Sequence, residues 1–169
     1  MAHPKHDDVR ERYQYQCGYC GISEVDAGGE LTVDHYQPVS AGGNDDDENL
    51  VYACIRCNQY KSDYWPDVQE MAAGNIVLHP LRDDILLHYQ ANELTGELDP
   101  KTPTGRFHIE LLDLNRHQLV SHRQRVWLQS LSDEIRRSLN EEISELHAEL
   151  RAYERYVFQL EQLLGIRKE

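Results

Sequence analysis

Apolar and polar residues are patterned in three different ways along this chain of 169 residues, and each pattern predicts a different kind of structure. Residues 1–65 contain short apolar runs separated by turn-forming residues. Residues 66–115 mix short apolar stretches with scattered glycine and proline turn signals. Residues 116–169 contain no proline, and no glycine before Gly165. We therefore expect an α+β fold that consists of a small first module, a mixed connecting segment and a long helix.

The first segment predicts two short strands followed by a helix. Residues 31–33 (LTV) are β-prone and run into the polar pair Asp34-His35, and residues 50–52 (LVY) form a second short apolar run. Pro38 and a Gly-Gly pair at 42–43 break the chain between the two runs. Asn58 lies where we expect the N-cap of a following helix. This order of strand, loop, strand and helix places polar side chains at the ends of elements.

The last segment predicts a helix with a heptad pattern of apolar residues. Their spacing alternates between four and three residues over roughly three heptads. The members of this seam are Leu139, Ile143, Leu146, Leu150, Tyr153, Val157, Leu160 and Leu164. We expect residues 116–165 to associate as a coiled coil, either as a homodimer or with a partner protein. The alternative is a helix that packs on its own domain.

Composition and charge narrow the class of protein. The chain is 40% hydrophobic and 28% charged, with a formal net charge of −13, which argues against a simple DNA-coating protein. Residues 116–169 nevertheless carry 9 Lys and Arg against 9 Asp and Glu, so this segment is neutral. Arg116, Arg123 and Arg125 in it are candidates for contacts with a nucleic-acid backbone. The alternative is a solvated helix face.

The chain has no run of about 18 apolar residues and no apolar segment of a signal peptide near its start. We therefore expect a cytoplasmic protein with no membrane association. All four cysteines occur as Cys17-x-x-Cys20 and Cys54-x-x-Cys57. In a reducing compartment, two such pairs favour one tetrahedral structural zinc ion over disulfides. A redox pair is the alternative, but the chain lacks the strand–helix–strand pattern that accompanies one.

Four polar residues lie between and beside the cysteine pairs. A zinc site that is only structural does not require them. The Asp34 carboxylate suits a hard ion such as Mg²⁺, and the His35 imidazole can take a proton from water. The Asn58 amide oxygen can complete a sparse magnesium shell, and the Asn49 side chain can pin the loop that carries His35. Taken singly, each has a simpler explanation as a turn, cap or surface residue.

Together these motifs resemble the HNH endonuclease family, in the order C-x-x-C, D-H, G-G, N-L-V and C-x-x-C-N, over residues 17–61. The resemblance implies a ββα-metal fold, with His35 as general base and Asn49 as the structural middle residue. It also implies Asp34 and Asn58 as ligands of one catalytic divalent ion. The last position of the motif is Asn58 rather than histidine, which favours Mg²⁺ or Mn²⁺ over softer ions.

We therefore expect a metal-dependent endonuclease that hydrolyses phosphodiester bonds in DNA, with a domain at 1–65, a supporting segment at 66–115 and an association helix at 116–169. Arg56 and Lys61 are further candidates for phosphate contacts. The alternative function is a catalytically silent, zinc-stapled nucleic-acid-binding or scaffold subunit that works through its helix. A third reading is the nuclease subunit of a larger machine, such as a phage-defence system.

Overall fold

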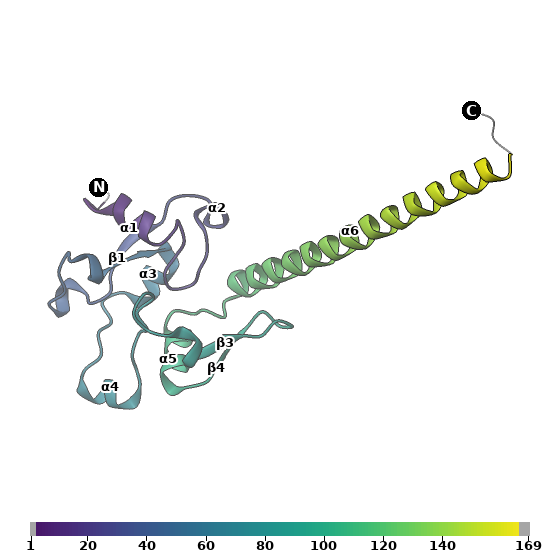
Figure 1. Ribbon diagram of the computed structural model, residues 1–169. Coiled ribbons are helices and arrows are strands. Elements are labelled where there is room, and N and C mark those ends of the chain that lie inside the picture. The colour runs from purple at the N-terminus through teal and green to yellow at the C-terminus, as the bar shows by residue number, and fades with distance from the viewer. Residues whose placement is uncertain (1–2, 166–169) are drawn as a thin grey trace. The chain divides into compact units, whose positions relative to one another are not determined.

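The computed structural model describes residues 3–165. The chain divides into two compact units, Met1–Gln124 and Arg125–Glu169. The chain has the expected α+β architecture, with several short helices, two small antiparallel sheets and one long helix (Figure 1). The expected connecting segment, 66–115, lies within the first unit together with the cysteine module. Among the described residues, no helix is long and apolar enough to span a lipid bilayer.

The centre of the first unit is a two-stranded sheet followed by a helix, as the sequence predicts. Strand β1 (Thr32–His35) pairs antiparallel with β2 (Leu50–Ala53), so that His35 lies opposite Leu50. Every residue of β2 is buried. Helix α3 (Ile55–Lys61) follows directly and packs against both strands. Its N-cap is Cys54, whose sulfur accepts from the Cys57 N–H, so the expectation of a cap at Asn58 is wrong.

Two short helices at the start of the chain were not predicted from the sequence. Helix α1 (His6–Arg12) buries Val9 against the sheet, and α2 (Glu24–Ala27) follows the first cysteine pair. The guanidinium of Arg10 donates to both carboxylate oxygens of Glu24 at 2.5 and 2.7 Å. This bidentate contact, with the Tyr52 hydroxyl also donating to Glu24, lowers the pKa of Glu24 to about 2. It joins α1 to α2.

The supporting segment contains α4 (Val68–Ala73), the hairpin of β3 (Tyr89–Ala91) and β4 (Leu98–Pro100), and α5 (Pro103–Leu111). Three 3₁₀ turns, Val39–Ala41, Asp47–Asn49 and Ile85–Leu87, complete the unit. Helix α5 starts at a Thr102 cap with proline in its first turn, as its sequence favours. His108 of α5 is 1% exposed and accepts from the Leu78 N–H, which fixes α5 to the preceding loop.

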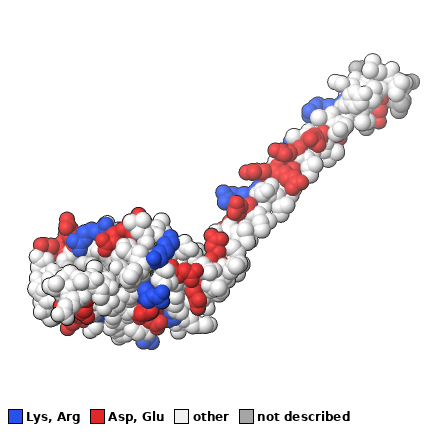
Figure 2. Space-filling model, turned by 90° about the horizontal axis from the view of Figure 1, so that it is seen from below, with Lys and Arg blue, Asp and Glu red and all other residues white. Residues whose placement is uncertain are grey.

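Helix α6 (His117–Leu163) contains 47 residues and confirms the long helix expected at 116–165. Its first turns belong to the first unit, where Leu119 is 1% exposed and joins the core. In the second unit every seam residue is exposed, from 37% for Leu160 to 72% for Leu164. Figure 2 shows acidic side chains along this helix beside uncharged ones. Among the residues of the second unit that the structure describes, none covers the apolar seam.

Candidate functional site

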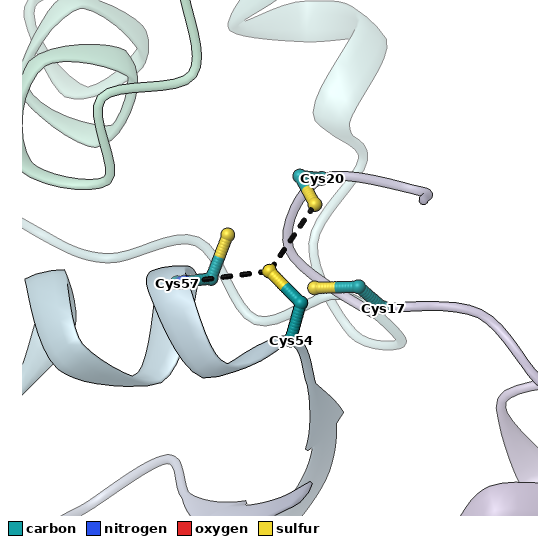
Figure 3. Close-up of side chains that lie close together, drawn as sticks. All are labelled: Cys17, Cys20, Cys54 and Cys57. Atoms are coloured by element: carbon teal, nitrogen blue, oxygen red, sulfur yellow. Dashed lines mark hydrogen bonds between the residues drawn. The ribbon is translucent and has the colours of Figure 1, made fainter. Parts of the chain in front are cut away.

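The four cysteines converge on one point at the edge of the central sheet. Cys17 and Cys20 come from the loop after α1, whereas Cys54 and Cys57 begin α3 (Figure 3). All four sulfur atoms lie within 4.8 Å of one another, and those of Cys20 and Cys54 are 3.8 Å apart. A tetrahedral zinc ion with Zn–S bonds of about 2.3 Å needs sulfur atoms about 3.8 Å apart. The cluster therefore fits the expected structural zinc.

Arg116 lies over this cluster. Its Nη2 is 3.7–3.9 Å from the sulfurs of Cys20, Cys54 and Cys57, and its Nη1 donates to the carbonyls of Leu112 and Asp113. A guanidinium at this position balances part of the negative charge of four thiolates. Arg116 is thus a partner of the zinc site, although the sequence suggested a contact with a nucleic-acid backbone.

The other basic candidates divide between interior and surface positions. Arg123 donates to the carbonyls of Gly96 and Leu114, so it holds the start of α6 to the first unit. Lys61 is 1% exposed, and its position corrects the expectation of a phosphate contact there. Arg56 and Arg125 are exposed.

Asp34 and His35 end β1 and, as adjacent strand residues, point to opposite sides of it. Asp34 is 6% exposed and accepts from the Tyr19 hydroxyl at 2.7 Å and from the Lys61 ammonium at 3.1 Å. The same ammonium donates to the His35 carbonyl at 2.6 Å. Burial raises the pKa of the Asp34 carboxyl, while Lys61 and Tyr19 act in the opposite direction. Asp34 and Lys61 thus form a buried ion pair at the end of β1, in which the ammonium offsets the charge of the carboxylate.

The His35 imidazole faces the loop between the two strands. Its Nε2 lies 2.7 Å from Oδ1 of Asp45, and Nε2 of His3 lies 3.4 Å from the same oxygen. The rings of His3 and His35 meet edge to face, with their centroids 5.8 Å apart. The sequence analysis missed both His3 and Asp45. Asp45 belongs to an acidic run that singles out no member, and His3 is far away in the chain.

Asn49 holds the loop between β1 and β2 in shape. Its Oδ1 accepts from the Gln37 N–H at 2.8 Å, and its Nδ2 donates to the carbonyls of Gln37 and Asn44 at 3.0 and 2.8 Å. A Cβ atom on Gly43 would come within 1.8 Å of the Gln37 carbonyl oxygen and 2.9 Å of the Asn49 Nδ2. The second glycine of the Gly-Gly pair therefore permits this close approach.

Asp34, His35 and Asn58 line one pocket, although they come from β1 and α3. The Nδ2 of Asn58 donates to the Thr32 hydroxyl at 3.1 Å, which fixes the orientation of the amide. Asp63, which the sequence analysis did not single out, lines the same pocket. The residues around the pocket supply a carboxylate and an amide, which suit a divalent ion, and an imidazole, which can act as a base.

Comparison with known proteins identifies the segment that contains this site. Residues 17–63 match the family model of the HNH endonuclease. A curated relative, Septu protein PtuA from Bacillus mycoides (strain KBAB4), is 25% identical over 145 residues. The alignment covers 70% of this chain but 20% of that protein, so the chain spans about a fifth of the length of this relative. No solved structure matches the chain. Residues 17–63 thus form an HNH endonuclease domain.

Proposed function

We propose that this HNH domain hydrolyses phosphodiester bonds in DNA, with His35 as general base and with Asp34 and Asn58 as ligands of one divalent ion. The observation that carries the proposal is that these three residues line a single pocket. Neither the zinc-binding cysteines nor a scaffold role requires that convergence. The same chemistry would act on RNA, and DNA is the substrate that we propose because the motifs of residues 17–61 resemble those of HNH endonucleases.

The environment of His35 supports its role as a base. Hydrogen bonding between Nε2 and the Asp45 carboxylate keeps the proton on Nε2 and leaves the lone pair on Nδ1. A neutral imidazole in this tautomer accepts a proton from water at Nδ1, and the adjacent carboxylate stabilises the imidazolium that forms. The deprotonated water then attacks the phosphorus in line with the departing 3′ oxygen. Asn49 contributes by holding the loop that carries Asp45.

Asp34 and Asn58 fit a hard divalent ion. A carboxylate offers about four lone-pair positions, and Tyr19 and Lys61 occupy two of them. The remaining positions and the Asn58 amide oxygen form an all-oxygen donor set, which suits Mg²⁺ or Mn²⁺. When bound, such an ion stabilises the charge that develops on the scissile phosphate and on the leaving oxygen. Lys61 keeps the buried carboxylate ionised so that it is ready for the ion.

The zinc site has a purely structural part in this proposal. Its four ligands are all cysteines, which leaves no open position for a substrate or water. The site joins the loop after α1 to the start of α3 and so fixes Asn58, which follows Cys57 directly. Arg56, exposed on the first turn of α3, and Arg125 remain candidates for contacts with flanking phosphates.

The likeness to a Septu protein supports a role as the nuclease subunit of a phage-defence assembly. Helix α6 offers the surface for such a partner. In its heptads the e and g positions, which flank the seam, include Glu142, Glu149, Glu154 and Glu161 and no lysine or arginine. In a parallel homodimer Glu149 would face Glu154 of the second copy, and like charges oppose that pairing. The favoured occupant is therefore a helix of another protein with basic residues beside its apolar seam.

The proposal is tested by incubating the zinc-loaded chain with supercoiled plasmid and Mg²⁺ or Mn²⁺. We expect nicked or linear DNA that depends on the added divalent ion. A folded, zinc-loaded chain that binds DNA without cleaving it would instead support the zinc-stapled scaffold.

A further inference from the structure

A second group of metal-ligating side chains lies on the far side of His35 from Asp34. It consists of His3 from the N-terminal segment, His35 from the end of β1 and Asp45 from the following loop, with ligand atoms all within 4.8 Å of one another. We infer that these three residues bind a second transition-metal ion, distinct from the structural zinc and from the oxygen ligands in the pocket. The N-terminal segment would thereby be tied to the proposed general base.

The distances suit such an ion. Zn²⁺ binds histidine nitrogen and carboxylate oxygen at about 2.0–2.1 Å, so two ligands of a tetrahedral site lie about 3.3 Å apart. The His3 Nε2 and the Asp45 Oδ1 are already 3.4 Å apart. The His35 Nε2 and the Asp45 Oδ1 are 2.7 Å apart and would separate by about 0.6 Å. The side chain of Asp45 is 65% exposed, so solvent rather than packed protein surrounds it as it moves.

The charges around the cluster leave the Asp45 carboxylate available to an ion. Lys5 directs its ammonium to the Asp47 carboxylate at 2.7 Å and reaches only the backbone carbonyl of Asp45, at 2.8 Å. Arg12 also pairs with Asp47. The two histidines are therefore the side chains on the Asp45 carboxylate, and their contacts lower its pKa. Asp46 adds a further negative charge that favours a cation here.

Binding requires a rearrangement of protons on both histidines. The proton that the His35 Nε2 directs to the Asp45 carboxylate must move to Nδ1. The Nδ1 of His3 accepts from the Lys5 N–H at 3.2 Å, which places the proton of its neutral ring on Nε2. An ion on the His3 Nε2 requires that proton to move to Nδ1, and this long hydrogen bond would then be lost. A metal–imidazole bond outweighs one such contact, because the free energy of binding a transition metal is large compared with that of a single long hydrogen bond.

The donor set predicts which ions bind. Two imidazoles and one carboxylate suit Zn²⁺, Co²⁺ or Ni²⁺, whereas Mg²⁺ prefers oxygen donors and keeps its water. Water would fill the remaining position. An ion on the His35 Nε2 places the ring proton on Nδ1, so that His35 could no longer take a proton from water. This last consequence rests on the proposed function of His35, but the binding of the ion does not.

The test is a titration of the zinc-loaded chain with Co²⁺ in a buffer that contains excess Mg²⁺. Calorimetry and the visible absorption of cobalt measure the binding. We expect one further equivalent to bind, with the weak visible bands of nitrogen and oxygen ligation. His3→Gln and Asp45→Asn should each weaken binding by at least about tenfold, which is the smallest loss seen when even an outer partner of a metal site is removed. His147→Gln, at an exposed position of α6, is the matched control and should bind as wild type.

Zinc content and circular dichroism establish that each variant keeps the cysteine site and the fold. The inference is overturned if no second equivalent binds to the wild type. It is equally overturned if the second equivalent binds His3→Gln as tightly as wild type, because the ion would then occupy another site. Neither result depends on cleavage activity, so the outcome is separate from that of the proposed nuclease function.

Discussion

The Nε2 of His35 lies 2.7 Å from the carboxylate of Asp45, ten positions further along the chain. A loop held by the Asn49 side chain brings the two groups together. The contact fixes one tautomer of the imidazole and gives an imidazolium a counterion. In this arrangement Asp45 is a positioning residue for the proposed base, although no feature of its acidic sequence run distinguishes it from its neighbours.

Asp45→Asn should reduce kcat for plasmid cleavage about ten- to hundredfold, in the range of carboxylates that orient a functional histidine. The amide keeps the size of the side chain and can still accept from Nε2, but it does not offset the charge of an imidazolium. KM and the melting temperature should stay near the wild-type values, measured with Mg²⁺ as the only added metal. Asp46→Asn, one position further, is the control. An equal loss in both variants would mean that the charge of the loop matters rather than the contact with His35.

Lys61→Met should destabilise the first unit by about 3–5 kcal/mol, because it leaves the buried Asp34 carboxylate without its counterion. Chemical denaturation of the zinc-loaded protein measures this change. Lys101→Met removes an ammonium that bonds a backbone carbonyl in an exposed region, and it should cost far less. If the two substitutions had equal effects, the ion pair beneath β1 would contribute nothing particular to stability.

His108 should make the protein less stable as the pH falls from about 6.5 to about 4. Burial lowers the pKa of its imidazole to about 4, below the value of about 6.5 in an unfolded chain. The unfolded state therefore binds more protons across this window, and the linked loss of stability is about 3 kcal/mol. His108→Gln, whose side-chain oxygen can accept from the Leu78 N–H, should show a correspondingly flatter pH dependence of unfolding. A slope equal to that of wild type would exclude His108 as its source.

The acidic residues that flank the apolar seam of α6 should make it bind partner helices according to their charge. A synthetic helix with the same seam and lysine at its e and g positions should bind the full chain, and one with glutamate there should not. Sedimentation should show a monomer in the absence of peptide. Ile143→Asp with Leu150→Asp should abolish peptide binding. A stable homodimer, or equal binding of both peptides, would contradict the proposal that the acidic residues beside the seam select a basic partner.

Much of the cysteine module could be predicted because its signals are local. Each cysteine pair is confined to four residues, the strands are short apolar runs, and the long helix has a heptad pattern with no proline. These features are confirmed as a four-cysteine cluster, β1, β2 and α6. Residues 17–63 match the family that these motifs resemble.

The remaining features depend on contacts between distant residues, which no local pattern reveals. The Cys54 sulfur takes the cap position that the sequence suggested for Asn58, because the second C-x-x-C pair itself begins the helix. The sequence suggested that Lys61 and Arg116 are surface cations. Lys61 instead pairs with the buried Asp34 carboxylate, and Arg116 lies against the cysteine sulfurs. The contact of His3 with Asp45 joins residues 42 positions apart.

The most direct test of the central claim compares plasmid cleavage by the wild type, His35→Ala and His147→Ala, with Mg²⁺ or Mn²⁺ and with EDTA. Removing a general base typically costs about 10²–10⁴-fold, so we predict a loss of that size in His35→Ala with unchanged zinc content and fold. His147→Ala should cleave like the wild type, and EDTA should stop cleavage. Cleavage by the zinc-loaded His35→Ala variant at the wild-type rate would contradict the proposed mechanism.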